Sequence, residues 1–227
     1  MVPLFARVWD RSPEELTIVV DDPVGRGLVH HVNGRVDPDR IVVRPVVGRD
    51  HERVERARRE NWSWLGRWEA TLPRGSREVL PDVATYRRRI DAQQRRGEAL
   101  MMMVELDGEV SGLVSASTVQ QGAMCQGVLG YWMVADAAGR GIGALSVAIV
   151  IDLLIGELGL HRVEVNVRPE NDRSLGLCAK LGLRREGLKV RYMNIAGEWA
   201  DHVAFAIDSE SMPEGGLVRT VWGESLA

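Results

Sequence analysis

Alternating hydrophobic and polar residues predict several β-strands. Across residues 162–168, three valines alternate with Glu164 and Asn166, which is the pattern of a strand with one buried face. Asp107 and Gly108 separate two further hydrophobic runs, and this dipeptide favours the tight turn of a β-hairpin. The strands predicted in this way cover residues 16–20, 27–32, 40–45, 100–106, 109–114, 130–134 and 162–168.

Helical periodicity marks other parts of the chain. Residues 50–62 and 80–97 repeat their hydrophobic positions at the helical period, which predicts two amphipathic helices. Residues 145–155 are almost entirely apolar and predict a long buried helix. A short helix is expected to begin near Asn171 and to end at Gly182.

These elements divide the chain into a main domain and two flanking segments. Residues 1–39 form an N-terminal extension, in which the strands at 16–20 and 27–32 are expected to make a β-hairpin. Residues 40–208 carry the main domain, because 227 residues with 45% hydrophobic content suffice for one full core. Residues 209–227 are polar, contain Gly and Pro, and are expected to be a loosely attached C-terminal tail.

A glycine-rich loop lies between the strand at 130–134 and the apolar helix. Glycines at 139, 141 and 143 leave backbone N–H groups uncovered at the helix start, where a phosphate is favoured. The spacing is not G-x-G-x-x-G, and the Lys-Ser/Thr pair of a P-loop is missing. The loop therefore predicts a pyrophosphate site of another type.

Six motifs follow one another along the main domain: N-W-S-W-L-G-R-W-E (61–69), G-Y-W-M-V (130–134), A-G-R-G-I-G-A (138–144), N-V-R-P-E-N-D-R-S (166–174), K-L-G-L-R-R-E-G (180–187) and Y-M-N-I-A-G-E-W-A-D-H (192–202). Their types and order resemble the GNAT superfamily of N-acetyltransferases, and within it the RimJ/RimL group. The resemblance covers about residues 40–208. Two positions depart from the family pattern: Ala138 stands where Gln or Arg is usual, and Val128 where some relatives carry a Glu that acts as a base.

This resemblance implies an α+β fold, with a mixed, mostly antiparallel twisted sheet, helices on both faces and a splayed central strand pair. It implies acetyl-CoA as co-substrate and direct acetyl transfer to a primary amine without a covalent enzyme intermediate. The RimJ/RimL group acetylates the N-terminal amine of ribosomal proteins. A protein N-terminus, with ribosomal proteins as the candidate class, is therefore the expected acceptor, and the enzyme is expected to be a monomer or a homodimer.

The resemblance also implies roles for single residues. Ser174 would protonate the departing thiolate, and Glu69 would recognise the incoming amine and accept its proton. Asn171 would contact the pantetheine arm, although its position also suits the N-cap of the short helix. Further acetyl-CoA contacts are expected from Met133, Val134, Gly139, Arg140, Gly141, Ile142, Gly143 and Ala144, and acceptor contacts from Trp64, Trp68, Tyr131, Tyr192 and Asp201. Asp201 and His202 form a pair that could instead be a structural buttress.

Composition narrows the choice of partners. A net charge of −3 and a pI near 6.0 argue against direct nucleic-acid binding, and the basic runs at 53–59 and 87–96 have the spacing of solvated helix faces. Two separated cysteines and five scattered histidines give no metal-site pattern. The sequence has neither a membrane-spanning run nor a signal-peptide pattern, so a cytoplasmic location is expected.

Two alternatives of different kind remain open at the level of sequence. The same fold could acetylate a small amine such as an aminoglycoside or a polyamine, which would call for an open, acidic pocket near Glu69 and Asp201. The chain could also be an acetyl-CoA-binding protein of the ribosome with weak catalysis, marked by Ala138 and Val128.

Overall fold

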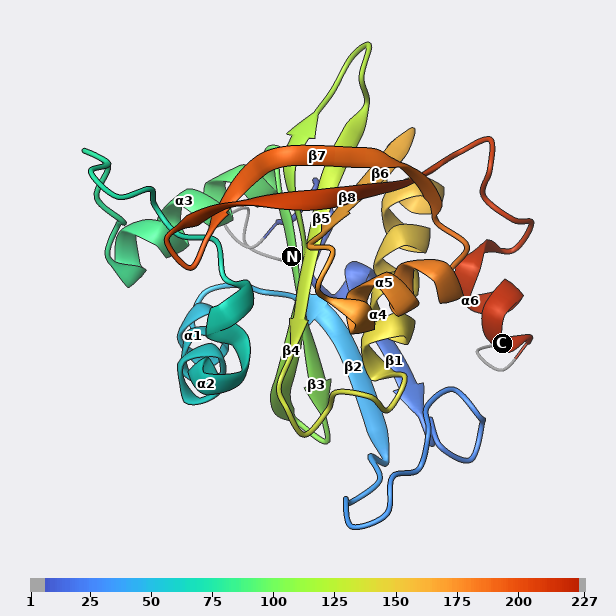
Figure 1. Cartoon of the computed structure of the whole chain (residues 1–227). Coiled ribbons are helices and arrows are strands. Elements are labelled where there is room, and N and C mark those ends of the chain that lie inside the picture. The colour runs from blue at the N-terminus through green and yellow to red at the C-terminus, as the bar shows by residue number, and fades with distance from the viewer. Residues whose placement is uncertain (1–6, 225–227) are drawn as a thin grey trace.

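The computed structural model describes residues 7–224, which form one sheet with helices packed against it (Figure 1). The sheet has eight strands in the order β1-β2-β3-β4-β5-β6-β8-β7. The strands are β1 (Ile18–Asp21), β2 (Arg40–Pro45), β3 (Leu100–Leu106), β4 (Glu109–Gln120), β5 (Gln126–Met133), β6 (Arg162–Val167), β7 (Arg184–Ile195) and β8 (Glu198–Asp208). The helices are α1 (Asp50–Glu60), α2 (Trp62–Leu65), α3 (Val83–Arg95), α4 (Ile142–Asp152), α5 (Asp172–Lys180) and α6 (Gly216–Trp222). Single turns of 3-10 helix cover Glu14–Leu16 and Gly66–Trp68, and a π-helical turn, Leu153–Glu157, extends α4.

The sheet is antiparallel except between β5 and β6. These two strands are parallel and pair only from Gln126 with Arg162 to Leu129 with Val165. Beyond this point they separate, because β5 continues to Met133 and β6 to Val167 without further pairing. The predicted α+β fold with a splayed central strand pair is confirmed.

Helices cover both faces of the sheet. Figure 1 shows α1, α2 and α3 on one side of the strands β3–β5, and α4, α5 and α6 on the other. Helix α4 is apolar on nearly every side and fills the larger core, against valines of β6 and β8. A smaller core lies under α1, where Val54 packs with Met101, Met103 and Leu113. We call the two sides of the sheet the α4 face and the α1 face.

The hairpin predicted inside residues 1–39 is wrong. β1 pairs antiparallel with β2, from Ile18 with Val43 to Asp21 with Arg40, and it forms one edge of the main sheet. Residues 27–32 form no strand. Leu28 and Val29 are buried in the larger core, so the apolar character of this segment reflects a loop packed on the core and not a strand.

The prediction of a loosely attached tail after residue 208 is also wrong for the part that the structure describes. Helix α6 packs against α4 and buries Leu217 and Val218. The carboxylate of Asp152 on α4 accepts the backbone N–H groups of Leu217 at 2.7 Å and Val218 at 3.0 Å. The first N–H groups of α6 are thus capped by a residue 65 positions earlier in the sequence. Because this partner is distant, the local sequence does not predict the cap. Within residues 7–224, no helix is long and apolar enough to cross a membrane.

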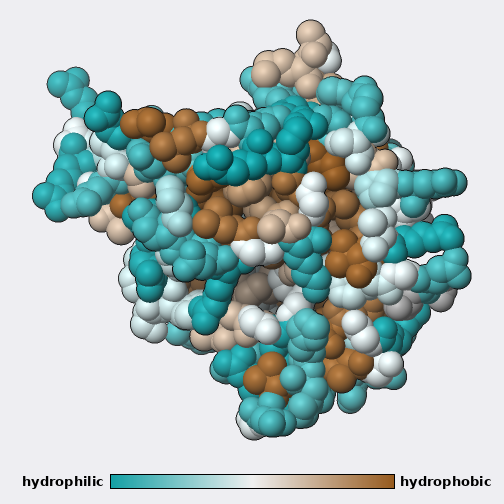
Figure 2. Space-filling view, turned by 45° about the vertical axis from the view of Figure 1, so that its right-hand side comes forward, coloured by the Kyte–Doolittle hydropathy of each residue, from teal (hydrophilic) through white to brown (hydrophobic). Residues whose placement is uncertain are grey.

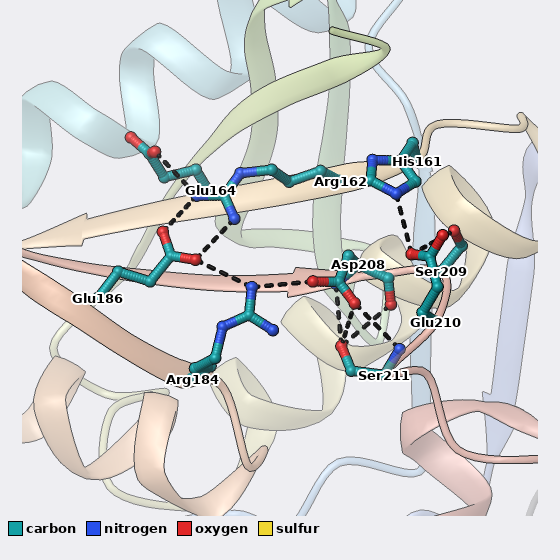
Figure 3. A network of polar contacts seen from close by, with 9 residues as sticks. All are labelled: His161, Arg162, Glu164, Arg184, Glu186, Asp208, Ser209, Glu210 and Ser211. Carbon is teal, nitrogen blue, oxygen red and sulfur yellow. Dashed lines mark hydrogen bonds and ion pairs between the residues drawn. The ribbon is translucent and has the colours of Figure 1, made fainter.

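Charged side chains fasten the last hairpin, β7–β8, to the rest of the sheet. Figure 3 shows Arg162 of β6 and Arg184 of β7 sharing the carboxylate of Glu186, while Arg184 also reaches Asp208 of β8. The two hydrogen bonds from Arg162 to the Glu186 carboxylate measure 2.5 and 2.8 Å. Hydrogen bonding to Arg162 lowers the pKa of Glu186 to about 2. The network therefore holds three strands in register while the carboxylate is ionised.

We expect Glu186→Gln to lower the free energy of unfolding at pH 7 by about 1 kcal/mol, a value reduced by solvent screening. Because the folded-state pKa lies below that of an unfolded glutamate, the carboxylate stabilises the fold above about pH 4.3 and loses its effect as the pH falls towards 2. Urea unfolding of wild type and variant should therefore differ at pH 7, and most of that difference should be lost at pH 2. Glu214→Gln, at an exposed carboxylate outside the network, is the control. An equal difference at both pH values would contradict the assignment.

Candidate active site

A cavity of about 760 Å³ occupies the gap between β5 and β6. Figure 2 shows a hollow near the centre of one side of the molecule, with apolar side chains among hydrophilic ones. The cavity walls come from α2 and the turn after it, β4, β5, the glycine loop before α4, β6, the start of α5 and the hairpin β7–β8. Segments that are far apart in sequence therefore meet at the point where the sheet opens.

The cavity is lined from both faces of the sheet. On β5, Leu129 and Met133 belong to the core on the α4 face, whereas Trp132 packs in the core under α1. Gly130 shares the α1 face with Ser115, its partner on β4. All five residues line the cavity, and so do Val165 from the α4 face and Asn166 from the α1 face of β6. The cavity thus connects the two faces through the gap in the sheet.

Backbone groups at the end of β5 face this gap. The N–H of Val134 donates to the Ser111 carbonyl at 2.9 Å and Val134 does not line the cavity, so its expected acetyl-CoA contact is wrong. Because hydrogen-bonded and non-bonded pairs alternate in an antiparallel ladder, Met133 turns its backbone groups away from β4 and towards the gap. Its carbonyl accepts the indole Nε1–H of Trp64 at 3.1 Å. Met133 keeps its predicted position, and Trp64 fixes the strand end.

The glycine loop leaves amide groups uncovered at the start of α4. Gly141 is the N-cap at φ 92°, and no side chain within residues 7–224 caps the helix. The N–H of Leu145 makes the bond to the Gly141 carbonyl at 3.0 Å, which leaves the amides of Ile142, Gly143 and Ala144 without helical partners. Gly139, Gly141, Gly143 and Ala144 line the cavity. A Cβ at Gly143 would lie 3.3 Å from the Met133 Cγ, so the close approach of α4 to β5 depends on glycine there.

The side chains of Arg140 and Ile142 point away from the cavity. The acetyl-CoA contacts expected of these two residues can therefore come only from their backbone groups. Ile142 is fully buried in the core. The guanidinium of Arg140 is buried and donates to the Val36 carbonyl at 2.9 Å and to Asp37 at 3.0 Å. The Arg140 carbonyl in turn accepts the His30 N–H at 2.6 Å. Residues 30–37 of the N-terminal extension therefore brace the glycine loop from behind.

The first turn of α5 lies at the α4 face of the cavity. Asn171 caps the helix, because its Oδ1 accepts the Ser174 N–H at 3.2 Å, and both residues line the cavity. The Tyr131 hydroxyl is buried beside Ser174 and makes no hydrogen bond of good geometry in the described chain, and burial raises the pKa of this phenol. Tyr131 lines the cavity, where a bound molecule could supply the missing partner.

Glu69 lies at the cavity wall as predicted, but its charge is already compensated. Arg58 donates to both carboxylate oxygens, at 2.7 and 2.5 Å. The pair is only partly exposed, at 16% for the Glu69 side chain. A carboxylate held in this way is a weak attractor for a second cation, so the geometry does not support the predicted role of Glu69 as base.

The aromatic wall of the cavity carries cations. Trp64 lies under the guanidinium of Arg173, at 4.7 Å from the ring centroid. Trp68 contacts the guanidinium groups of Arg67 and Arg168, at 4.4 and 5.7 Å. Trp64, Trp68 and these three arginines all line the cavity, together with Lys180. The open, acidic pocket expected for a polyamine or an aminoglycoside is not what the geometry shows.

The predicted acceptor residues Tyr192 and Asp201 are not part of the cavity wall. Asp201 accepts the Arg191 N–H at 2.7 Å and so stabilises an irregular part of the hairpin β7–β8. Tyr192 packs edge-on against the ring of His202, with 5.5 Å between ring centroids. His202 itself is buried and lines the cavity, so the Asp201–His202 pair contributes a buttress and a site residue. The sequence motif indicated both residues, but it assigned the acceptor contact to Asp201, whereas the structure places His202 at the cavity wall.

The described chain contains no cluster of side chains suited to bind a metal ion. Within residues 7–224, no group of three or more His, Cys, Asp or Glu side chains could hold a metal ion. Cys178 is buried, and burial raises the pKa of its thiol to about 12. This cysteine therefore stays a neutral thiol and is unsuited to act as a nucleophile.

Comparison with known proteins gives a consistent result. The model of the acetyltransferase (GNAT) domain family matches residues 40–184. The chain is 29% identical over 184 residues to the [ribosomal protein uS5]-alanine N-acetyltransferase of Escherichia coli, covering 80% of this chain and 94% of that protein. It is 35% identical over 101 residues to a Bacillus subtilis protein named "Probable N-acetyltransferase YjcK", covering 44% of this chain and 56% of that relative.

A solved structure supports the same assignment. Mycobacterium smegmatis RimJ, in complex with CoA-disulfide, superposes with a TM-score of 0.72 at 31% identity, over 82% of this chain and 90% of that one. The gap between β5 and β6, the uncapped glycine loop and the cavity that joins both faces are thus found in a chain whose main domain matches the family model. The protein belongs to the GNAT acetyltransferase family and is an N-acetyltransferase.

Proposed function

We propose that this enzyme transfers the acetyl group of acetyl-CoA to the N-terminal α-amine of a protein, with ribosomal proteins as the acceptor class. The observation that carries the proposal is the cavity that passes through the sheet from the α4 face to the α1 face. Two substrates entering from opposite faces would meet at the gap between β5 and β6. The Escherichia coli relative, named for acetylation of a ribosomal protein, matches over nearly its whole length.

The α4 face suits acetyl-CoA. The free amides of residues 142–144 and the positive end of the α4 dipole would hold the pyrophosphate. The Met133 backbone in the gap and the side chain of Asn171 would meet the pantetheine arm. The relative crystallised with CoA-disulfide shares this fold, and the residues present here fit such a ligand.

The chain's own groups favour direct transfer. Cys178 is a buried thiol, and neither it nor Cys125 lines the cavity, so we assign the site the role of bringing amine and thioester together. Ser174 sits on the α4 face of the cavity, and its hydroxyl would protonate the departing thiolate. The Tyr131 hydroxyl, which lies beside Ser174, would donate to the same region.

The charge of the cavity favours a protein N-terminus over a polycationic small molecule. The exposed charges at its wall are Arg67, Arg173 and Lys180, whereas Arg168 is partly buried and paired with Glu170, and Glu69 is neutralised by Arg58. A polyamine or an aminoglycoside would bring several positive charges into this positive surrounding, whereas a peptide terminus brings one.

We expect a peptide that starts with alanine to be acetylated with a kcat/KM at least tenfold above that of spermidine or kanamycin. Release of thiol from acetyl-CoA measures all three under the same conditions. Faster turnover of either small amine would overturn the assigned acceptor. Tight acetyl-CoA binding without turnover of any amine would favour an acetyl-CoA-binding protein of the ribosome.

We expect Ala144→Asp to weaken CoA binding at least tenfold, which corresponds to about 1.4 kcal/mol. Ala144 lies in the first turn of α4 and lines the cavity, and a carboxylate there repels a phosphate held by the same amides. Isothermal titration calorimetry gives the affinity, and thermal unfolding reports on the fold. The matched control is Ala84→Asp, in the first turn of α3 and exposed. Unchanged CoA affinity in Ala144→Asp would place the pyrophosphate elsewhere.

A further inference from the structure

The amine of the acceptor must lose protons during transfer, and the residues considered so far supply no base. Val128 is apolar, and Glu69 is held by both nitrogens of an Arg58 fork. Two other polar side chains line the cavity on the α1 face, Asn166 of β6 and His202 of β8. Within residues 7–224, the Oδ1 of Asn166 accepts no hydrogen bond, and the hydrogen bond of His202 is at Nδ1, which leaves its Nε2 available.

The tautomer of His202 follows from its one hydrogen bond. Its Nδ1 lies 3.1 Å from the carbonyl oxygen of Ala200, and a carbonyl can only accept. Nδ1 therefore carries the hydrogen, and in the neutral ring the lone pair is on Nε2. The ring is only 4% exposed, so charging it is unfavourable. These facts leave Nε2 as a base in a buried position at the cavity wall.

Several charged groups surround the ring. Burial lowers the pKa of His202, and Arg168 acts in the same direction. Glu170 and Asp201 act in the opposite direction. On β7, Tyr192 packs against the ring edge, and Lys189, the cross-strand partner of His202, lies over the Tyr192 ring, 4.6 Å from its centroid. With burial as the largest effect, the ring is neutral at neutral pH.

Asn166 supplies the second acceptor. Its Nδ2 donates to Glu164 at 2.8 Å, and because a carboxylate only accepts, this contact fixes which end of the amide is which. Its Oδ1 is buried and has no hydrogen-bond partner within residues 7–224. Buried acceptors are almost always satisfied, so an unsatisfied one at a cavity wall points to a donor on a bound molecule.

Strand register brings the two acceptors together. Asn166 pairs with Ala204 of β8, and His202 lies two residues before Ala204, on the same face. The two side chains are therefore diagonal neighbours across adjacent strands, within reach of one small group between them. A primary amine, with more than one N–H to donate, fits such a pair.

We propose that His202 Nε2 is the general base of the transfer and that Asn166 Oδ1 accepts a second hydrogen bond from the same amine. This inference rests on the proposed acetyl transfer. His202 takes one proton from the bound ammonium and later releases it to solvent. The amine nitrogen forms the bond to the thioester carbon, the carbon–sulfur bond breaks, and the remaining excess proton passes to the thiolate, with Ser174 as the donor on that side. The products are the acetylated amine, CoA thiol and one released proton.

The decisive test is the pH dependence of His202→Gln. Glutamine can accept a hydrogen bond but cannot take a proton at these pH values, so we expect kcat/KM at pH 7 to fall about 100-fold. The remaining activity should rise with pH until the free amine is deprotonated, near pH 8, and the loss should shrink there. CoA affinity and thermal stability should stay near wild type. The matched control is His161→Gln, at an exposed histidine that pairs with Glu210 away from the cavity.

Asn166→Ala separates binding of the amine from its deprotonation. We expect the KM for the acceptor to rise about tenfold, while the shape of the pH profile remains that of wild type. A His202→Gln enzyme with the wild-type pH profile would overturn the proposal. A parallel loss of CoA affinity and stability in both variants would also overturn it, because the residues would then be structural.

The outcome does not depend on which amine is the natural acceptor. The same pH series can be run with whichever amine the wild-type enzyme turns over best. Turnover of small amines alone would contradict the proposed protein acceptor. The pH profile of His202→Gln would then still test whether His202 is the general base. A normal profile with peptide acceptors would defeat the base and leave the proposed function standing.

Discussion

The separation of β5 from β6 beyond Leu129 and Val165 is the constraint on which the rest of the site depends. A sheet that parts in its interior leaves backbone groups without their usual partners, and each must be satisfied by another group. The Met133 carbonyl is taken by the Trp64 indole, and Val134 is tied back to Ser111 of β4. The opening is thus kept as a defined cavity that gives two substrates access to one point from opposite faces.

The elements around the opening contribute different groups on the two faces of the sheet. On the α4 face, the glycine loop offers amides, and residues 30–37 hold its outer side through Arg140. On the α1 face, the hairpin β7–β8 brings His202 beside Asn166, and the ionic network of Arg162, Arg184 and Glu186 fixes that hairpin to β6. Residues 30–37 therefore fix the position of the glycine loop, and the hairpin β7–β8 fixes the position of His202.

Local patterns in the sequence predicted the features that depend on local chemistry. The glycines of the loop, the cap at Asn171 and the alternating strand β6 stand where expected, because backbone conformation and side-chain period are short-range properties. Roles that depend on distant partners were not predictable. Arg140 turns to Val36, Val134 bonds to Ser111, and Glu69 is neutralised by Arg58, and none of these pairings leaves a mark on the local pattern. His202 was visible only as part of a motif, since its exposure to the cavity comes from the register of β8 with β6.

The central claim is that the two substrates approach through opposite faces of the sheet and react in the gap between β5 and β6. A crystal structure with a bisubstrate ligand, in which CoA is joined through an acetyl group to the N-terminus of a short peptide, tests it most directly. The account predicts the pyrophosphate at the amides of residues 142–144, the linker between β5 and β6, and the peptide nitrogen on the α1 face beside His202 and Asn166. A ligand with both halves on the same face of the sheet would contradict it.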